Sequence, residues 1–531
     1  MSSAALTLDQ DIWRPKYNPW LIAAVVSLAA FMEVLDTSIA NVALPYMAGN
    51  LGASNDDSTW VLTSYLVSNA IVLPISGWLA GRFGRKRFFM VCLFLFTVTS
   101  LLCGTASSLG LLLFYRILQG AGGGGLQPMA QAILADTFPP QKRGLAFALY
   151  AITAIVAPTI GPTLGGWITF NYSWRWIFFI NLPVGIAALF MVYRLVTDPP
   201  YLSRLKTAAV KLDYIGISLL TLGVGALQVL LDRGQEDDWF GSHFITTLAV
   251  IAVVGLVSLV IWEWFHKSPI IDVRLFKNVN FAKANLLIFM LGFAYFSSLV
   301  MMPLFLQTLL GYTAQVAGFA ISPGAFVLLL ITPVVGVLTT KFQARYLAAF
   351  GWLYLAGAML YSTVHIDLLI SFNSAVWLRV VQVAGLGFLF VPINLVAYIG
   401  IAPEKNNAVA GLVNFMRNIG SSVGTSFVTT MLVRRSQYHQ QILTDYSRPG
   451  NFNFQNAVKG LTQHLAHSGL GAHQALTQAY ARIYQLVQVQ AASLAYIDTF
   501  KVLAVASAIM FLLAFTLKKN EPGGGGDLAV G

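Results

Sequence analysis

Long apolar stretches recur along the whole chain and alternate with short charged or Gly- and Pro-rich breaks. Each stretch has about 20 residues, which is enough for an α-helix to cross a hydrocarbon core of roughly 30 Å. The pattern predicts fourteen membrane-spanning helices, near residues 19–45, 58–80, 87–106, 110–134, 144–168, 176–197, 213–231, 243–265, 284–305, 315–339, 346–363, 376–400, 407–433 and 497–517. We therefore expect an all-α protein that crosses the membrane many times.

The composition agrees with this pattern. Hydrophobic residues make up 57% of the 531 residues and charged residues only 10%, whereas a soluble domain carries about 25% charged residues. The formal charge is +11, but the Lys and Arg residues lie in short clusters between apolar segments. Such clusters indicate membrane topology and argue against a nucleic-acid partner.

The cationic clusters also orient the predicted spans. Connections near 81–87, 142–143, 194–211 and 267–283 are rich in Lys and Arg, whereas those near 46–57, 107–109, 306–314 and 364–375 contain none. The positive-inside rule then places both termini in the cytoplasm. The connection at 434–496 lies on the outer side although it contains basic residues, because long loops cross a membrane regardless of charge. We expect an external helix from about Gly471 to Ile497.

Two pairs of segments indicate an internal repeat. GWLAGRFGRKRFF at 77–89 has a weaker counterpart in GVLTTKFQARYLA at 336–348, and RILQGAGGGG at 116–125 corresponds to RVVQVAGLGF at 379–388. Similar offsets suggest two halves of six spans with two helices inserted between them, which is the plan of the major facilitator fold. The expected domains are a cytoplasmic N-terminus (1–18), an N-terminal six-helix bundle (19–197), two inserted helices with linkers (198–283), a C-terminal six-helix bundle (284–517) that contains a periplasmic loop (434–496), and a cytoplasmic tail (518–531).

Several motifs resemble those of a known transporter family. LDTSIANVALP at 35–45, the 77–89 and 116–125 segments, APTIGPTLGG at 157–166, WRWIFFINLPVG at 174–185, LDRG at 231–234 and RNIGSSVGTS at 417–426 resemble the motifs of fourteen-span drug:proton antiporters of the EmrB type. The resemblance implies a multidrug exporter that is not an enzyme, needs no cofactor and is driven by the proton gradient. It also implies the bacterial inner membrane, a periplasmic adaptor protein and an outer-membrane channel.

The sequence departs from this family at two positions. Gly81 stands where the family usually has Asp, so a charge contact between helices is either missing or replaced. Glu33 stands where close relatives often have a polar amide, so a second carboxylate at this place alters cation preference or proton stoichiometry.

Glu33 and Asp36 are the acidic residues that lie deep in a predicted span. A spacing of three residues places them on one helix face, and ionisable groups within spans are functional suspects because hydrocarbon disfavours charge. Two neighbouring carboxyl groups in a poorly hydrated cavity hold a proton more readily than solvated ones. Arg116, which the family resemblance implicates in proton transfer, is the expected partner. We therefore predict proton coupling by Asp36, Glu33 and Arg116; the alternative is a static structural pair.

Small and cationic residues form two further motifs. The 77–87 turn is expected to gate the cytoplasmic side or to bind anionic lipid headgroups, through Gly77, Arg82, Gly84, Arg85 and Lys86. Prolines and glycines in the fifth span are expected to bend it and to let the two halves rock against each other, at Pro158, Gly161, Pro162, Gly165 and Gly166. The Gly120–Gly125 run matches G-x-G-x-x-G, but it follows no strand, so close helix packing is the better interpretation than a nucleotide site.

Polar residues within apolar spans are candidates for a substrate cavity that is otherwise apolar and aromatic. They are Asn41, Gln119, Gln127, Asn394, Asn414 and Arg417. Arg379 could instead extend its side chain to the outer interface. No metal site is expected, because Cys92 and Cys103 share one segment and His464 and His467 have no diagnostic spacing.

These features favour proton-coupled export of amphipathic and hydrophobic drugs and toxic compounds. One alternative is a dedicated exporter of a single endogenous metabolite or siderophore, which would share the same motifs. A different class is a membrane receptor or enzyme that does not transport, although the sequence offers no nucleophile with a base, metal cluster or soluble catalytic domain.

Overall fold

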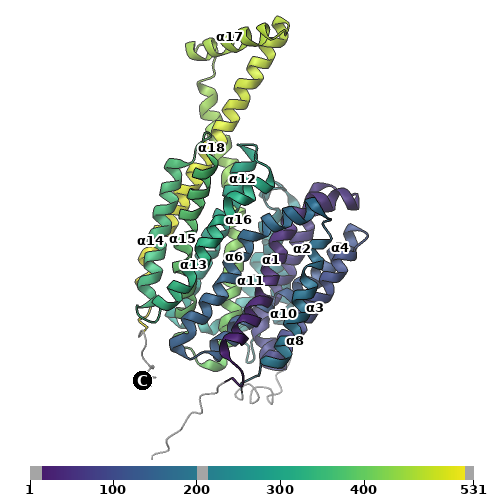
Figure 1. The fold of residues 1–531 in the computed structure, drawn as a ribbon, viewed down its shortest axis with the longest axis vertical. Coiled ribbons are helices and arrows are strands. Elements are labelled where there is room, and N and C mark those ends of the chain that lie inside the picture. Colours follow the sequence, from purple (N-terminus) through teal and green to yellow (C-terminus); the bar gives the residue numbers. More distant parts are fainter. Residues whose placement is uncertain (1–14, 200–212, 521–531) are drawn as a thin grey trace, which may run out of the picture.

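The computed structural model describes residues 15–199 and 213–520. Parts of three predicted segments therefore lie outside the described residues, namely most of the N-terminal segment 1–18, most of the linker at 198–211 and most of the tail at 518–531. The described chain is built from helices that pack side by side, with a long helical projection at one end (Figure 1).

The N-terminal half contains six helical segments, two of which are interrupted. Because α4 and α5 follow each other directly, as do α7 and α8, each pair occupies the place of one predicted span. The elements are α1 (Pro19–Leu51), α2 (Asn55–Phe83), α3 (Arg85–Thr105), α4 (Leu109–Gly123), α5 (Leu126–Thr137), the short η1 (Pro140–Lys142), α6 (Arg143–Asn171), α7 (Trp176–Phe179) and α8 (Asn181–Leu195).

Two inserted helices precede the C-terminal half. They are α10 (Tyr214–Arg233) and α11 (His243–Phe265), with the short η2 (Trp239–Gly241) between them and η3 (Val273–Lys277) after them. The C-terminal half contains α12 (Val279–Thr308), α13 (Ala314–Leu338), α14 (Ala344–His365), α15 (Phe372–Ala397), the short η4 (Pro403–Lys405), α16 (Asn406–Asp445), α17 (Phe452–His467) and α18 (Ala472–Ala514).

Each of the fourteen predicted spans corresponds to a helical segment in the described part of the chain. Twelve of them are long and apolar enough to cross a membrane, and one of these twelve, Trp176–Leu195, combines α7 and α8. The other two are the span at 110–134, which is broken between α4 and α5, and the span at 407–433, which lies in the less apolar α16. Fourteen spans are thus consistent with the structure, and the chain is a multi-pass membrane protein.

Serine residues begin equivalent helices in the two halves. The Ser108 side chain accepts a hydrogen bond from the backbone N–H of Leu111 at the start of α4, and Ser371 does the same for Ser374 at the start of α15. Such a cap satisfies one of the backbone donors that the first helical turn leaves unpaired. The two helices consequently present their following side chains in the same register.

The bundle has two ends, which we call the terminal face and the arm face. Both ends of the described chain lie at the terminal face, where Asn520 accepts a hydrogen bond from the backbone of Ala344 and Trp20 packs against Phe138 with ring centroids 4.9 Å apart. The arm face is the opposite end, from which the projection extends (Figure 1).

The projection, which we call the arm, comprises residues 434–496. It consists of the last turns of α16, all of α17 and the first half of α18 (Figure 1). With 43 residues, α18 is about 65 Å long, roughly twice the thickness of a hydrocarbon core. At the base of the arm, Asp498 on α18 accepts hydrogen bonds from Arg435 Nε over 2.8 Å and pairs with His439 Nε2 at 2.7 Å. The external helix expected from about Gly471 is the outer part of α18.

The inserted helix α10 contacts both halves. Gln228 on α10 and Ser422 on α16 exchange hydrogen bonds of 2.9 and 3.0 Å, while Arg233 at the end of α10 donates to Thr59 on α2 over 2.9 Å. The neighbouring α11 packs mainly on α10 and leaves many apolar side chains exposed, as expected of a helix that faces lipid.

Candidate functional site: a buried polar network

A buried ion pair joins α1 and α4 inside the N-terminal half. Arg116 Nη1 donates to Oδ2 of Asp36 over 2.6 Å, and at most 2% of either residue is exposed. Arg116 Nε donates to the carbonyl oxygen of Val61 over 3.1 Å, and the guanidinium lies 4.3 Å from the ring centroid of Tyr65. These contacts offset part of the cost of removing two charges from water. The structure thus brings together the two residues that the sequence suggested as partners.

Two amides complete the surroundings of Asp36. Oδ1 of Asp36 accepts hydrogen bonds from Gln119 Nε2 over 3.1 Å and from Asn181 Nδ2 over 2.7 Å. Gln119 also accepts from Arg116 Nη1 over 2.8 Å. Both oxygens of the carboxylate therefore accept hydrogen bonds from neighbouring side chains. Gln119, predicted as a substrate-cavity residue, thus lies beside the ion pair.

Glu33 lies one turn away and has a different set of partners. Its Oε1 accepts hydrogen bonds from the Tyr65 hydroxyl and from Asn69 Nδ2, each over 3.0 Å, and its Oε2 accepts from Gln127 Nε2 over 2.6 Å. These donors are neutral, whereas Asp36 has a charged partner. Tyr65 connects the two carboxylates, because its hydroxyl binds Glu33 while its ring faces Arg116.

Hydrogen bonds extend from Glu33 into the C-terminal half. Gln127 accepts from Arg417 Nη2 on α16, and Arg417 also donates to Asn414 over 2.7 Å. Asn414 accepts from the Tyr150 hydroxyl over 3.0 Å and donates to Gln131 over 2.5 Å. Gln131 in turn donates to Asn394 on α15 over 2.6 Å. We call this set, from Asp36 to Asn394, the polar network; it crosses from one half to the other through buried and half-buried side chains.

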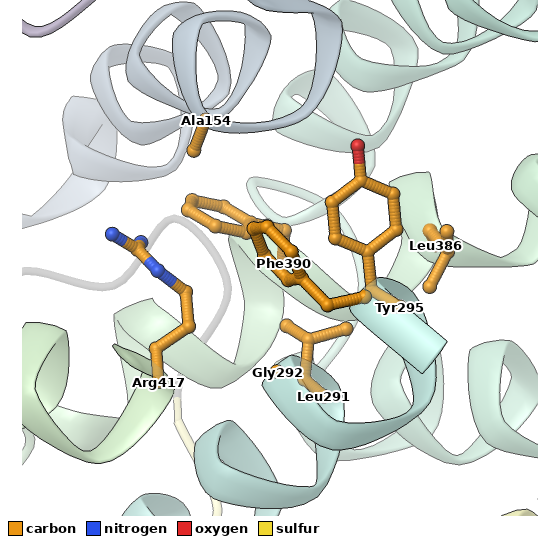
Figure 2. A pocket seen from close by; sticks show the side chains of 8 residues that line it. Ala154, Leu291, Gly292, Tyr295, Leu386, Phe390 and Arg417 are labelled. Atoms are coloured by element: carbon orange, nitrogen blue, oxygen red, sulfur yellow. The ribbon is translucent and has the colours of Figure 1, made fainter. Parts of the chain in front are cut away.

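A small cavity lies beside the polar network, between α6 and helices of the C-terminal half. Figure 2 shows Phe390 between Arg417 and Tyr295, and the Arg417 guanidinium lies 5.4 Å from the Phe390 ring centroid. The remaining lining is apolar and comprises Ala154, Leu291, Gly292, Phe296 and Leu386. Apolar and aromatic walls with one cation are the lining that an amphipathic ligand needs, but in the described conformation the cavity has room for little more than a water molecule.

The cationic turn between α2 and α3 meets the C-terminal half at the terminal face. Arg85 is buried and pairs with Asp136 on α5, and Asp136 also accepts from Asn406 of α16 over 2.7 Å. The turn thus makes a buried charge contact with α5, although Gly81 itself carries no charge. Gly84 connects the two helices with φ 91°, in the left-handed region that favours glycine.

The other motif residues in and near this turn differ in their contacts and in their exposure. Lys86 donates from Nζ to the carbonyl oxygen of Tyr193 over 2.6 Å, whereas the side chain of Arg82 is exposed. A Cβ atom on Gly77 would lie 2.9 Å from the Asn407 carbonyl oxygen, so this glycine permits close approach of α2 and α16.

The proline and glycine residues of α6 face α1. Pro162 has no N–H with which to bind the carbonyl oxygen of Pro158, and Ser38 of α1 donates to that oxygen over 2.9 Å instead. A Cβ atom on Gly161 would lie 2.3 Å from Ser38 Oγ, and one on Gly165 would lie 3.0 Å from Ile39. Gly166 has only an ordinary contact, 3.8 Å from Val42.

On another side, α6 contacts the C-terminal half. The hydroxyl oxygens of Thr163 on α6 and Ser322 on α13 are 2.9 Å apart. Thus α6 lies between α1 and α13, at a boundary between halves.

Two sequence-predicted polar residues lie elsewhere. Asn41 is exposed and stands apart from the polar network. Arg379 is completely buried, so the alternative in which it reaches the outer interface is wrong. Ser298 on α12 accepts a hydrogen bond from Arg379 over 3.1 Å, which holds the side chain inside the bundle.

The structure adds residues that the sequence reasoning had not singled out. Asn181, Tyr65, Asn69, Gln131 and Tyr150 all belong to the polar network. All five lie within predicted apolar spans, and the amides among them, Asn181, Asn69 and Gln131, carry the signal that identified the other amides. A further buried carboxylate, Glu263, accepts from the backbone of Ile270 over 3.0 Å at the end of α11.

Comparisons with known proteins agree on one family. The family described as the Major Facilitator Superfamily matches residues 26–425. The multidrug export protein EmrB of Escherichia coli strain K12 is 39% identical over 463 residues, covering 86% of this chain and 90% of that protein. The fatty acid resistance protein FarB of Neisseria gonorrhoeae is 39% identical over 455 residues, covering 85% of this chain and 87% of that protein.

A solved structure has the same fold. The proton:xylose symporter XylE covers 95% of this chain and 97% of its own, with a TM-score of 0.61 and 15% sequence identity. The relatives and the structural neighbour are membrane transporters, not enzymes.

Proposed function

The chain belongs to the Major Facilitator Superfamily, and on this premise we propose that it exports amphipathic and hydrophobic compounds in exchange for protons. Transport proceeds by alternating access of a central site to the two sides of the membrane. The observation that carries the proposal is the fully buried Asp36–Arg116 pair, since an ionisable pair in a membrane interior is costly and usually functional.

Proton binding at Asp36 changes the contacts between helices. In the ionised state, the carboxylate accepts hydrogen bonds from Arg116, Gln119 and Asn181, which hold α1, α4 and α8 together. A proton on Oδ2 removes the acceptor that Arg116 uses and cancels the charge attraction. Protonation thereby favours a different arrangement of the three helices, which couples the proton to conformation.

The polar network relates this event to the substrate cavity. Glu33 binds Gln127, Gln127 binds Arg417, and Arg417 lines the cavity. A substrate that accepts a hydrogen bond from Arg417 Nη2 competes with Gln127 for that donor. Release of Gln127 removes one of the three hydrogen bonds of Glu33, so substrate binding and carboxylate protonation influence each other.

The positive-inside rule supports an orientation of the bundle. The cationic turn at 81–87 lies at the terminal face, so we place this face and both termini in the cytoplasm and the arm in the periplasm. The protein would then lie in a bacterial inner membrane. The arm exposes apolar and aromatic side chains beyond the bundle, among them Phe452, Tyr484 and Leu486, which supports contact with a periplasmic adaptor that leads to an outer-membrane channel.

A second candidate is export of one compound class only. FarB, at 39% identity, is named for resistance to fatty acids, and this supports a narrower substrate range as the alternative. Accumulation of several chemically different compounds in cells that lack other pumps separates the two, because a dedicated exporter lowers the accumulation of one class alone.

The coupling role of Asp36 is tested by Asp36→Asn. We expect energised efflux to be lost while insertion into the membrane is retained; full retained efflux would contradict the proposal. Because Asn leaves Arg116 buried without a counter-charge, the double variant Asp36→Asn/Arg116→Gln serves as a second test without an orphaned cation. Asp56→Asn is the matched control, since the Asp56 side chain is exposed at the start of α2 and should leave efflux unchanged.

A further inference from the structure

Equivalent arginine and glutamine residues occur in both halves. Arg116 lies seven residues after the first residue of α4, and Arg379 lies seven residues after the first residue of α15. A glutamine follows each arginine by three residues and accepts from its Nη1, Gln119 over 2.8 Å and Gln382 over 3.4 Å. The internal repeat has therefore kept one buried cation in each half.

The partners of the two arginines differ in charge. Arg116 binds the carboxylate of Asp36 on the first helix of its half, whereas Arg379 binds the neutral hydroxyl of Ser298 on the first helix of its half. Within residues 15–199 and 213–520, no carboxylate forms an ion pair with Arg379. Its Nε and Nη2 atoms are buried and have no hydrogen-bond partner.

A guanidinium in this state favours a bound anion. Arginine stays protonated in proteins, so it cannot escape the cost of burial by losing its proton. Its free Nε and Nη2 donors form one edge of the planar fork, which matches the two oxygens of a carboxylate. An anion of this shape would supply the charge that Asp36 supplies to Arg116.

Arg379 lies on α15, which lines the cavity of Figure 2, although its own side chain is not part of that lining. Tyr295, which lines the cavity, lies one helical turn before Ser298 on α12, so both are on the same helix face. On α15, Leu386 lines the cavity two turns after Arg379. A ligand that extends about two helical turns along α15 would thus place its apolar part in the cavity and its anionic group at Arg379.

We propose that Arg379 binds the carboxylate, or an equivalent anionic group, of amphipathic organic substrates whose apolar body occupies this cavity when movement of the helices has widened it. The inference rests on the proposed export function and names a substrate class for it. Arg379 has no exposed surface in the described conformation. An anion therefore reaches it in another conformation of the transport cycle, and its charge stabilises the bound state.

The test compares two fluorescent ligands that differ only in charge, an aryl carboxylate and the corresponding neutral carboxamide. Their dissociation constants are measured on the purified full chain. For Arg379→Gln, we expect the preference for the carboxylate over the carboxamide to fall at least tenfold. An unchanged preference in a folded variant overturns the proposal.

Ser298→Asp provides a second test that does not remove the buried cation. The new carboxylate reproduces the Asp36–Arg116 arrangement, so it occupies Arg379 and should weaken binding of the aryl carboxylate at least tenfold. Ser298→Asn is matched in size and adds no charge, so its effect on the same preference should be clearly smaller. Equal effects of the two substitutions count against an anion site.

Two further measurements distinguish a wrong substrate assignment at Arg379 from a wrong export function. In the first, chloride is added and thermal unfolding is measured. If chloride protects the wild-type protein but not Arg379→Gln, and Arg379→Gln keeps the preference for the carboxylate, the site binds an inorganic anion. The substrate assignment is then overturned. In proteoliposomes, Arg379-dependent binding of the aryl carboxylate without any transport of it contradicts the proposed export function and leaves the binding site standing.

Discussion

Asp36 and Glu33 lie three residues apart on α1 and are surrounded in different ways. Asp36 has a buried cationic partner, whereas the direct hydrogen-bond partners of Glu33 are the neutral groups of Tyr65, Asn69 and Gln127. At this scale, Asp36 fits a proton switch that makes or breaks an ion pair. Glu33 is placed to connect Asp36 with the C-terminal half, because it binds Gln127, which in turn binds Arg417.

Replacement of Glu33 should therefore have a weaker effect than replacement of Asp36. Glu33→Gln leaves the Asp36–Arg116 pair intact but places one amide donor opposite another at Gln127, so we expect reduced but measurable proton-driven efflux. The measurement is efflux rate under an imposed proton gradient, with Asp36→Asn beside it. If Glu33→Gln abolishes efflux as completely as Asp36→Asn does, both carboxylates are needed for coupling and the division of roles is wrong.

The charged residues of the site were easier to predict from the sequence than the neutral ones. Glu33, Asp36 and Arg116 are conspicuous because charge within an apolar span is costly. Asn181 and Gln131 carry no charge, and only the packing of α8, α5 and the C-terminal half decides which partners they meet. The burial of Arg379 was equally hidden, because a position near the end of a span permits both an interfacial and an interior side chain.

At the scale of elements, contact between α2 and α16 joins the halves near the terminal face. Gly77→Ala should disturb this contact, because the new methyl group would lie 2.9 Å from the carbonyl oxygen of Asn407. We expect a loss of about 1–3 kcal/mol of stability, as for other overpacked contacts, together with slower efflux.

Gly81→Ala is the matched control on the same helix. A Cβ atom there meets nothing within 4 Å, so the substitution should be neutral or slightly stabilising. Thermal unfolding of both purified variants checks the prediction. Equal stabilities would mean that close approach at Gly77 is unimportant.

The arm is a second element whose role is testable. Residues 446–490 include α17 and the outer part of α18, which pack on each other around Leu465, Ala475 and Ala479, apart from the main core. Replacing this segment with a short flexible linker should reduce co-purification with the periplasmic adaptor while the spans still insert. Unchanged co-purification would count against the arm as the contact.

The elements themselves followed closely from the hydrophobic pattern, and two of the departures from it have a physical reason. The predicted span at 110–134 is interrupted at Gly124 and Gly125, and the helix predicted to end near 433 continues to Asp445. Close packing explains the first, since a Cβ atom on Gly124 would lie 2.7 Å from the Asn69 carbonyl oxygen. The α16 helix continues beyond its apolar stretch with polar residues, and hydropathy does not predict a helix of polar residues.

For the whole molecule, the proposed mechanism requires the two halves to move relative to each other. Thr163 on α6 and Ser322 on α13 are 2.9 Å apart across their boundary. Cysteines at both positions should form a cross-link under mild oxidation, after replacement of the native Cys92 and Cys103. We expect the cross-link to stop efflux and a reductant to restore it; efflux at the full rate with the cross-link formed would contradict movement at this boundary.

The inserted helix α10 also lies at the boundary between the two halves. Through Gln228 and Arg233, α10 contacts both α16 and α2, so it lies against the two halves together. The repeat predicted from the sequence accounts for the helices on either side of this insertion, and it also accounts for the two buried arginines. What the repeat could not show is that one arginine has a carboxylate partner and the other does not.

The central claim is that export of a substrate and inward movement of protons are coupled through Asp36. The most direct measurement is internal pH in proteoliposomes that contain the purified protein and receive a pulse of transported substrate without an imposed proton gradient. The account predicts a substrate-dependent proton flux opposite in direction to the substrate in the wild-type protein and none with Asp36→Asn. Substrate transport without proton flux in the wild type, or the same flux in both proteins, would contradict it.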